Sequence, residues 1–459
     1  MTARAGAPRL VRSGWGLLLL LVLVCACQPQ PTISGLGVAD ERELPQDPAR
    51  YLCPPGPPAW SLDPARQRAM MEDFRQRFFA PWDQDGPSQD AQETRQDFLD
   101  FRGALGYGEN RLPRDQSWLD GLLELAGLED FPNAGYAAIS LGVVDLRALP
   151  TARPLVEGFD HPGQGLAFDQ IQQSLLAQST PLYVAHASRD GAWLWCDTPI
   201  GPGWLRAEMV ARAPGPLRAQ WRGSRLAAVV QDDVSLRDGQ GVFRGQAGLG
   251  AVLPLMALDG QGARVLMAVG VDGLAQTRPL RLAAGQAVEM PWPLTPAKLA
   301  LLAGRLMGQA YGWGGSFGNR DCSSMVKDLF TPFGLWLPRN SGDQARQGGL
   351  FLGLGGLAPE EKERRILAEG PPGLTLVWRP GHIMLYLGRW RGQAVVLHNL
   401  WGLPTRDAGG REGRQVVGRA VVTTLRAGRE LPNLARPGGL LLNRVEGMTL
   451  LVPPGQPPR

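Results

Sequence analysis

Hydrophobic residues recur at helical spacing in the first third of the chain. A helix predicted over residues 63–79 has Asp63 as its N-cap and Pro64 in its first turn. Its apolar side carries Met70, Met71, Phe74 and Phe78. Two further segments of this kind follow at 90–105 and 116–128, so the pattern predicts a helical segment that ends near residue 130.

The pattern changes to short apolar runs separated by Gly- and Pro-rich turns between residues 131 and 292. Strand candidates lie at 139–149, 182–184, 192–196, 204–207, 227–230, 234–236, 252–255, 265–269 and 287–290. Short strands joined by tight turns are typical of small β-barrels. We therefore expect two barrels in series, at 131–213 and 214–292, with a single larger β-domain as the alternative.

Helical and strand patterns occur together again from residue 293. Thr295 can cap a helix whose apolar residues are Leu299, Leu302, Ala303, Leu306 and Met307. A loop, further helix and several strands follow, which predicts a third domain over 293–440. The remaining residues, 441–459, end in a Pro-rich stretch and are expected to form a loose tail. The whole chain is predicted to be an α+β protein of several domains.

The N-terminus has the pattern of an export signal. Three arginines precede an apolar core over 16–24, which is too short for a confident membrane span. The sequence Val24-Cys25-Ala26-Cys27 resembles a bacterial lipobox, in which Cys27 would be acylated. We expect a signal peptide over 1–26, then a tether and the helical segment over 27–130. The protein would be lipid-anchored to a membrane in the periplasm or cell envelope; cleavage nearby with release of a soluble protein is the alternative.

Charge and cysteine content limit the remaining possibilities. The formal net charge is +4 and includes the signal arginines, so the mature chain is nearly neutral and has no sign of a nucleic-acid-binding surface. Cys53, Cys196 and Cys322 remain once Cys25 and Cys27 are set aside. A Cys53–Cys196 disulfide would leave Cys322 unpaired, but the sequence does not decide between a bridge and buried free thiols.

Cys322 is the strongest candidate nucleophile. It follows a Gly-rich loop and opens an amphipathic helix, for which Asp321 is a natural N-cap. A thiol at a helix N-terminus is expected to have a lowered pKa because the helix dipole favours the thiolate. The alternative is a buried, inert cysteine.

Two of the four histidines lie in one predicted hairpin downstream of Cys322. Residues 381–388 and 394–399 read as its strands, and pairing around residue 391 makes His382 and His398 diagonal neighbours on one face. A one-residue shift would separate them. Nucleophile, base and orienting group are then Cys322, His382 and His398 in that order. A metal site is disfavoured because no third ligand stands nearby, and we expect no cofactor; His161 and His186 are taken as structural.

These motifs together resemble the NlpC/P60 cell-wall peptidases. The matching pieces are Tyr311-Gly312-Trp313-Gly314-Gly315, Asp321-Cys322-Ser323, Gly381-His382 and His398. The upstream layout is similar to members with an N-terminal stabilising segment and two bacterial SH3 (SH3b) barrels. The sequence departs from the family at Ser324, where Gly is usual, and at Leu374, where a Gly-Asp pair usually precedes the histidine strand.

The resemblance implies a papain-like catalytic domain and hydrolysis of the γ-D-glutamyl–diaminopimelate bond in peptidoglycan stem peptides. Cys322 would attack the carbonyl, His382 would carry the proton and His398 would orient His382. Tyr311 would help to stabilise the oxyanion, and Asp321 and Ser323 would line the pocket for the peptide's amino end. The first barrel would favour short stems with a free L-Ala, and we expect a monomer. The alternatives are a non-catalytic murein-binding lipoprotein and an amidase or acyltransferase on the same core.

Overall fold

The computed structural model describes residues 37–452 except 57–59, 104 and 161–163. The described residues up to 130 are mainly helical, and the bounds of the longer helices follow from their caps. Asp63, Asp90 and Asp115 each accept a hydrogen bond from a backbone N–H in the first turn of the helix that follows. The elements are α1 (Ala39–Glu43), α2 (Ala49–Leu52), α3 (Pro64–Phe79), η1 (Ala80–Asp83), α4 (Ala91–Arg102), α5 (Gln116–Ala126) and η2 (Leu128–Asp130). The three helices predicted in this part of the chain are confirmed.

The middle of the chain forms two β-modules. The first contains β1 (Tyr136–Ser140), β2 (Val144–Arg147), β3 (Gln172–Leu176), β4 (Pro181–Ala187), β5 (Trp193–Thr198), β6 (Gly201–Arg206), η3 (Ala207–Met209) and β7 (Val210–Arg212). The second contains α6 (Gly215–Gly223), β8 (Arg225–Val229), β9 (Val234–Arg237), β10 (Phe243–Ala247), β11 (Val252–Asp259), β12 (Gly262–Val271), β13 (Leu274–Ala283) and β14 (Ala287–Glu289).

The two β-modules share one hydrogen-bonded sheet. Its strand order is β14-β8-β11-β12-β13-β7-β1-β4-β5-β6-β2-β3, and β9 and β10 pair separately. The link is a short parallel pairing of Leu274 in β13 with Arg212 in β7. The apolar run predicted at 139–149 is two strands, β1 and β2, because Gly142 lies in the turn between them.

The C-terminal part is a sheet with helices packed against it. Its elements are α7 (Pro296–Leu306), η4 (Trp313–Gly318), α8 (Cys322–Phe330), η5 (Thr331–Phe333), α9 (Ser341–Gln347), β15 (Leu350–Gly353), α10 (Pro359–Glu369), β16 (Thr375–Arg379), β17 (His382–Trp390), β18 (Gln393–Arg406), β19 (Glu412–Thr424), η6 (Leu442–Arg444) and β20 (Gly447–Leu450). The sheet order is β15-β20-β16-β17-β18-β19. One apolar cluster, which includes Leu302, Val326 and Leu385, fills the space between this sheet and α7 and α8.

The prediction of a loose tail over 441–459 is wrong for the described residues. Strand β20 lies inside the sheet, between β15 and β16, and Met448 and Leu450 are buried there. This short apolar run forms an interior strand because it pairs with a neighbour on each side and completes the sheet. The Pro-rich end at 453–459 lies outside the described residues.

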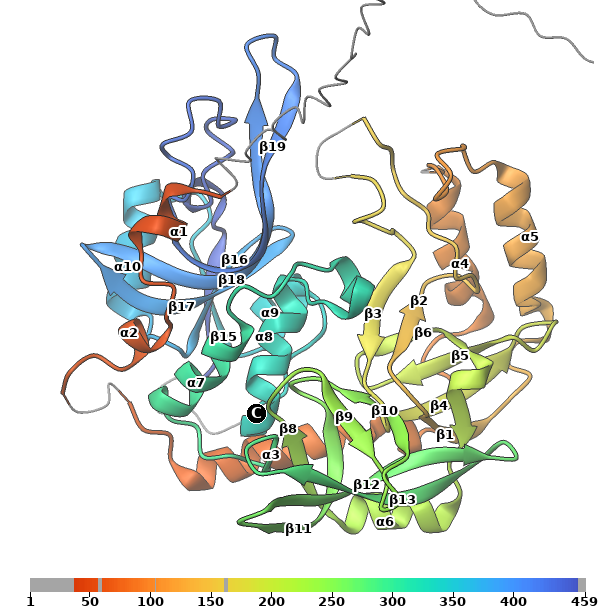
Figure 1. Cartoon of the computed structure of the whole chain (residues 1–459). Coiled ribbons are helices and arrows are strands. Elements are labelled where there is room, and N and C mark those ends of the chain that lie inside the picture. The colour runs from red at the N-terminus through yellow and green to blue at the C-terminus, as the bar shows by residue number, and fades with distance from the viewer. Residues whose placement is uncertain (1–36, 57–59, 104, 161–163, 453–459) are drawn as a thin grey trace, which may run out of the picture. The chain divides into compact units, whose positions relative to one another are not determined.

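Helix α3 packs against both β-modules and also contacts the start of the C-terminal part. Met71, Phe74 and Phe78 pack into a cluster with apolar residues of both β-modules. On its other side, the buried Gln67 donates to the backbone carbonyls of Trp292 and Phe333 and accepts from the N–H of Leu294. Figure 1 shows α3 beside the strands of the second module, in agreement with this cluster. The helical segment thus contacts the junction between the second β-module and the C-terminal part.

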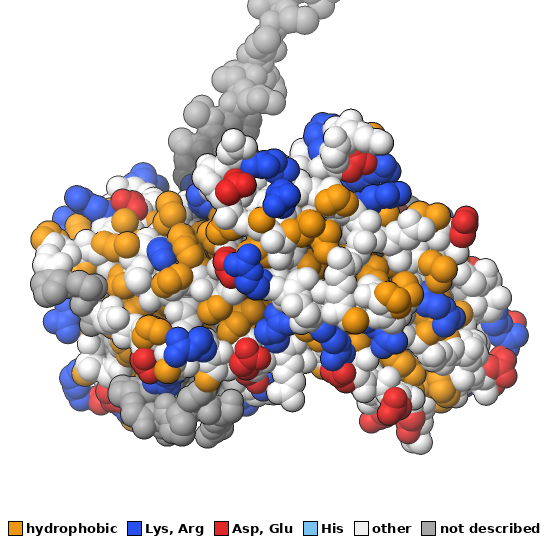
Figure 2. Space-filling view, turned by 90° about the horizontal axis from the view of Figure 1, so that it is seen from below, with side chains coloured by type: hydrophobic (Ala, Val, Ile, Leu, Met, Phe, Trp, Pro, Cys, Tyr) orange, Lys and Arg blue, Asp and Glu red, His pale blue; other side chains and the backbone are white. Residues whose placement is uncertain are grey.

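No helix among the described residues is long and apolar enough to cross a membrane. On the face drawn in Figure 2, hydrophobic side chains are interspersed with acidic and basic ones. The described cysteines Cys53, Cys196 and Cys322 are all free, so the open question of a Cys53–Cys196 bridge is answered in favour of free thiols in this structure.

Candidate active site

Helix α8 begins at Cys322 because Asp321 caps it. The Asp321 carboxylate accepts from the backbone N–H of Ser324 at 2.8 Å and from the hydroxyls of Ser324 and Ser323 at 2.9 and 3.1 Å. Ser324 returns a bond to the Asp321 N–H at 2.9 Å, which completes a capping box. Ser324 therefore has a structural reason to stand where the family usually has Gly.

The loop before the helix is shaped by glycines that touch the first β-module. Gly314 and Gly315 have φ of 59° and 88°, and a Cβ on either would come within 2.5 Å of Gln172 or Leu175 in β3. The side-chain amide of Gln172 also donates to the Gly314 carbonyl at 3.1 Å. The first β-module therefore forms one wall of the segment that carries Cys322.

The thiol of Cys322 lies beside β17, the strand that begins at His382. The backbone N–H of Ile383, the residue after His382, points to the Cys322 sulfur. Cys322 is 6% exposed and His382 is 4% exposed. Among the described residues, no hydrogen bond joins the thiol to the imidazole, and catalytic contacts of this kind commonly tighten only when substrate is bound.

The predicted hairpin register is confirmed. Trp390 pairs with Gln393 and Leu385 with Leu397, with a bulge between them, so His382 and His398 are diagonal neighbours. Their rings are in contact: His382 Nε2 lies 2.8 Å from His398 Nδ1. On its far side, His398 Nε2 lies 3.0 Å from the hydroxyl of Thr423 in β19. With Nε2 engaged in this way, Nδ1 is the ring nitrogen of His382 that has no partner within this pair.

Burial controls the protonation of these groups. Burial raises the pKa of Cys322 to about 12, and the neighbouring Asp321 charge adds to this, while the Ile383 N–H, Arg339 and Arg379 oppose it. Burial also holds the pKa of His382 well below its usual range and lowers that of His398 to about 3, with Arg379 contributing to both. The sequence-based expectation of a lowered thiol pKa is therefore not met. Thiol and imidazole are both uncharged at neutral pH.

A buried ion pair fixes Asp321. Arg339 Nη2 lies 2.5 Å from Asp321 Oδ2, and its Nη1 donates to Ser323 Oγ at 2.9 Å. Arg339 Nε donates to Ser174 Oγ in β3 at 2.7 Å, so the same guanidinium joins the first β-module to the start of α8. Burial alone would raise the pKa of Asp321, but Arg339 keeps it below its ordinary value. Asp321 and Ser323 lie together as predicted, and their direct contact with substrate stays a prediction.

Aromatic side chains from the first β-module and from the C-terminal part pack together near Cys322. Phe168, from the long connection between β2 and β3, lies 6.2 Å from Tyr311, 5.5 Å from Trp313 and 5.3 Å from Trp401, measured between ring centroids. Tyr311 is close enough to Cys322 for the two to interact electrostatically, and burial raises its pKa. Phe168 and Trp401 were not predicted. Phe168 reaches this place only through tertiary packing, because the strand that follows it, β3, was itself not predicted.

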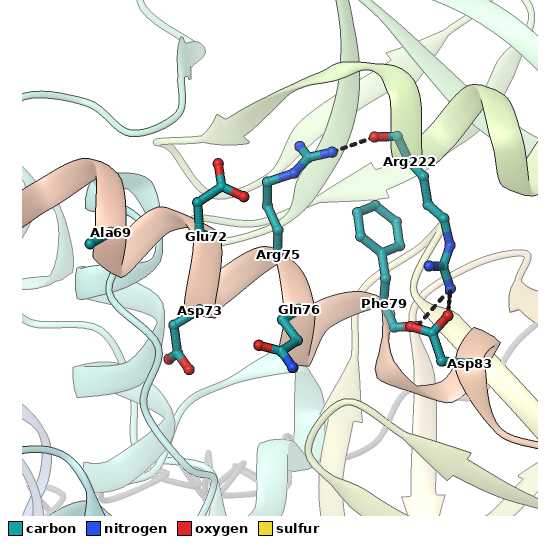
Figure 3. A pocket seen from close by; sticks show the side chains of 8 residues that line it. All are labelled: Ala69, Glu72, Asp73, Arg75, Gln76, Phe79, Asp83 and Arg222. Atoms are coloured by element: carbon teal, nitrogen blue, oxygen red, sulfur yellow. Dashed lines mark hydrogen bonds and ion pairs between the residues drawn. The ribbon is translucent and has the colours of Figure 1, made fainter. Parts of the chain in front are cut away.

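Two cavities of the described part of the chain are not lined by Cys322. A cavity of about 460 Å³ lies where both β-modules meet α8, and Arg320, Lys327 and Asp328 are among its lining residues. An open pocket of about 520 Å³ lies on α3, and its Arg75 and Arg222 bind backbone carbonyls and Asp83 (Figure 3). Cys322, His382 and His398 are not among its lining residues.

Other candidate residues have structural roles or lie outside the described part. His186 is fully buried and its Nε2 lies 2.7 Å from the Ala126 carbonyl, as expected for a structural histidine. His161 and the lipobox with Cys27 lie outside the described residues. Within the described residues, no cluster of three or more His, Cys, Asp or Glu side chains could hold a metal ion.

The raised thiol pKa generates a prediction for alkylation of the resting protein. Between about pH 6 and about pH 9, the rate of Cys322 modification by iodoacetamide should rise about tenfold per pH unit, because the thiolate fraction rises in that proportion below the pKa. Mass spectrometry of the Cys322 peptide measures it, with the exposed Cys53 as internal reference. A rate that is already at its plateau near pH 6 would mean a preformed thiolate–imidazolium pair and would contradict this account.

Comparison with known proteins agrees with this geometry. Family models match the chain at 15–131 (NLPC_P60 stabilising domain, N term), 154–206 (SH3 domain, SH3b1 type), 218–259 (SH3 domain of SH3b2 type) and 308–403 (NlpC/P60 family). None of the curated proteins compared with this sequence matches it.

One solved structure shares the fold over most of the chain. An NlpC/P60 endopeptidase from Photobacterium damselae subsp. piscicida superposes with a TM-score of 0.79 at 23% identity, over 88% of this chain and 97% of that one. An NlpC/P60 family protein from Bacillus cereus ATCC 10987 has a TM-score of 0.43 at 17% identity, over 62% of this chain and 83% of that one. The four domain matches, in this order along one α+β chain, assign this protein to the NlpC/P60 family of peptidoglycan hydrolases, with an N-terminal stabilising domain and two SH3b domains.

Proposed function

We propose that this protein is a cysteine endopeptidase that hydrolyses the γ-D-glutamyl–diaminopimelate bond of peptidoglycan stem peptides. The observation that carries the proposal is the thiol of Cys322 at the start of α8, beside a His382–His398 pair whose ring nitrogens are 2.8 Å apart. Nucleophile, base and orienting group are the three components that acyl transfer to a thiol requires.

The chemistry follows from the uncharged resting state. Cys322 Sγ attacks the amide carbonyl carbon while its proton passes to Nδ1 of His382, and the backbone N–H of Cys322 with the Tyr311 hydroxyl stabilises the oxyanion. His382 then gives this proton to the leaving amine, which leaves a thioester on Cys322. A water molecule attacks the thioester, transfers a proton to His382 and releases the γ-glutamyl product, and the thiol is restored.

The first SH3b domain has the position needed to limit the substrate. Arg339 and Gln172 join it to the segment around Cys322, and Phe168 packs on Tyr311 and Trp313. A wall at this place leaves little room for a bulky group on the amino end of the peptide. This supports the preference for short stems with a free L-Ala, and it argues against a merely wall-binding role for the catalytic part.

The first prediction concerns the nucleophile. Cys322→Ala should lower the rate of diaminopimelate release from L-Ala-γ-D-Glu-diaminopimelate by at least about 1000-fold, because the covalent route is lost. The matched control is Cys53→Ala, since Cys53 is an exposed free thiol, and this variant should keep wild-type activity. Chromatography of the released amino acid measures both. Cleavage by Cys322→Ala at the wild-type rate would refute the proposal, and activity of the wild type on other acyl donors alone would favour the amidase or acyltransferase alternative.

The second prediction concerns the length of the substrate. The wild type should cleave the free stem with a kcat/KM at least about tenfold above that for the same stem linked to a muramyl residue, because a tenfold ratio needs only about 1.4 kcal/mol of unfavourable contact. Phe168→Ala should lower the ratio of kcat/KM for the free stem to kcat/KM for the muramyl-linked stem. It removes the side chain through which the first SH3b domain packs on Trp313. Equal cleavage of both substrates by the wild type would contradict the role given to the first SH3b domain.

The third prediction concerns the anchor. We propose that Cys27 carries a lipid that holds the protein to a membrane of the cell envelope, on the basis of the lipobox-like sequence at 24–27. The wild type expressed with its leader should partition into the detergent phase, and Cys27→Ser should move to the aqueous phase. A wild-type protein found only in the aqueous phase would exclude the anchor without affecting the catalytic proposal.

A further inference from the structure

Beyond the catalytic pair, a chain of hydrogen bonds continues from His398 into the sheet. His398 Nε2 lies 3.0 Å from Thr423 Oγ1, and this hydroxyl lies 2.9 Å from the backbone carbonyl of Thr424. In the β18–β19 register Thr423 pairs with Val396, two residues before His398, so the two side chains are diagonal neighbours on one face. His398, Thr423 and His382 are all buried, and the first two are fully so.

The backbone carbonyl of Thr424, at the end of this series of hydrogen bonds, determines which group donates in each bond. A carbonyl oxygen only accepts hydrogen bonds, so the single proton of the Thr423 hydroxyl is directed to Thr424 O. Thr423 Oγ1 must then accept from His398, which requires a proton on Nε2 of His398. A neutral imidazole carries one N–H, so Nδ1 of His398 has a lone pair and accepts from Nε2–H of His382.

We infer that Thr423 is a positioning residue that sets the tautomers of both histidines and so keeps Nδ1 of His382 unprotonated as the base. The inference rests on the proposed function for its kinetic consequence, whereas the tautomers themselves are properties of the resting protein. In the reverse arrangement, Thr423 would donate to His398, His398 would donate to His382, and Nδ1–H of His382 would face the thiol. That arrangement cannot take a proton from Cys322.

His382 and His398 both have lowered pKa values, so the direction of the hydrogen bonds between them and Thr423 matters. At neutral pH both rings are uncharged, so the hydrogen bonds on each ring decide which nitrogen carries its proton. During attack on the substrate His382 gains a proton at Nδ1 and becomes a cation. The lone pair on His398 Nδ1 then accepts from that cation, and Thr423 retains its hydrogen bond to His398 throughout.

The test uses Thr423→Val, which removes the hydroxyl at nearly constant shape, and Thr423→Ser, which keeps it. Thr423→Val should lower kcat/KM on the free stem about 10- to 100-fold, the usual cost of losing a partner that orients a functional histidine, and Thr423→Ser should restore most of it. Thr449→Val is the matched control, since Thr449 is a fully buried threonine in β20 whose hydroxyl donates to the Ala345 carbonyl away from the histidines.

Nitrogen-15 NMR of the imidazoles at neutral pH gives a readout that packing alone would not change. In the wild type, His398 and His382 should both be protonated at Nε2, and in Thr423→Val the His398 proton should move to Nδ1. A wild-type His398 protonated at Nδ1 would overturn the inference, as would unchanged tautomers and kcat/KM in Thr423→Val. The wild-type spectrum needs neither turnover nor a variant, so if Thr423→Val does not fold, His398 protonated at Nδ1 in the wild type still overturns the inference. It also separates a failure of the hydrogen-bond chain from a failure of the proposed substrate.

Discussion

The buried ion pair between Arg339 and Asp321 is the interaction on which the active site depends. Asp321 caps the helix that carries Cys322, and Arg339 is the cation that makes a buried carboxylate tolerable there. Breaking such a pair by removing one partner typically costs about 3–5 kcal/mol, because an uncompensated charge stays buried. Since Arg339 also binds Ser174, the same contact joins the first SH3b domain to the catalytic helix.

A second charged cluster holds the residue before Asp321. Arg320, whose side chain is 11% exposed, binds Asp232 of the second SH3b domain at 2.8 Å and Asp328 of α8 at 2.7 Å. It also donates to the Leu249 carbonyl of that domain at 2.9 Å. Both SH3b domains therefore contact the short segment 320–324, one through Arg339 and the other through Arg320. In this chain the SH3b domains belong to the architecture of the active site.

Burial outweighs the helix dipole at Cys322. A helix N-terminus stabilises an anion by about 0.3–1 kcal/mol and at most about 2 kcal/mol, which corresponds to roughly one pKa unit. Full burial can shift a pKa by about 3–5 units in the opposite direction. The raised pKa of the thiol follows from this comparison. Under the proposed function, the nucleophile is protonated in the resting protein, so the orientation of the neutral histidines is the main requirement for proton transfer.

Short-range sequence patterns predicted the positions of helices and strands better than they predicted tertiary contacts. The caps at Asp63, Thr295 and Asp321 and the hairpin around residue 391 are short-range signals, and they located the helices and the His382–His398 pair. Strand β20 was missed because four residues at the end of a chain give a weak pattern, although they fill the middle of a sheet. Arg339, Phe168 and Thr423 reach the site only through tertiary packing, and the thiol pKa depends on burial, which no spacing in the sequence encodes.

The central claim is that Cys322 forms a covalent intermediate with the γ-glutamyl part of a stem peptide. Rapid acid quenching of the enzyme with L-Ala-γ-D-Glu-diaminopimelate, followed by peptide mass spectrometry, tests it directly. The account predicts a transient L-Ala-γ-D-glutamyl thioester on Cys322 that forms and decays at rates compatible with turnover. Hydrolysis of the peptide at full rate with the acyl group on another residue, or with no acyl-enzyme at any time in a reaction shown to be limited by deacylation, would contradict it.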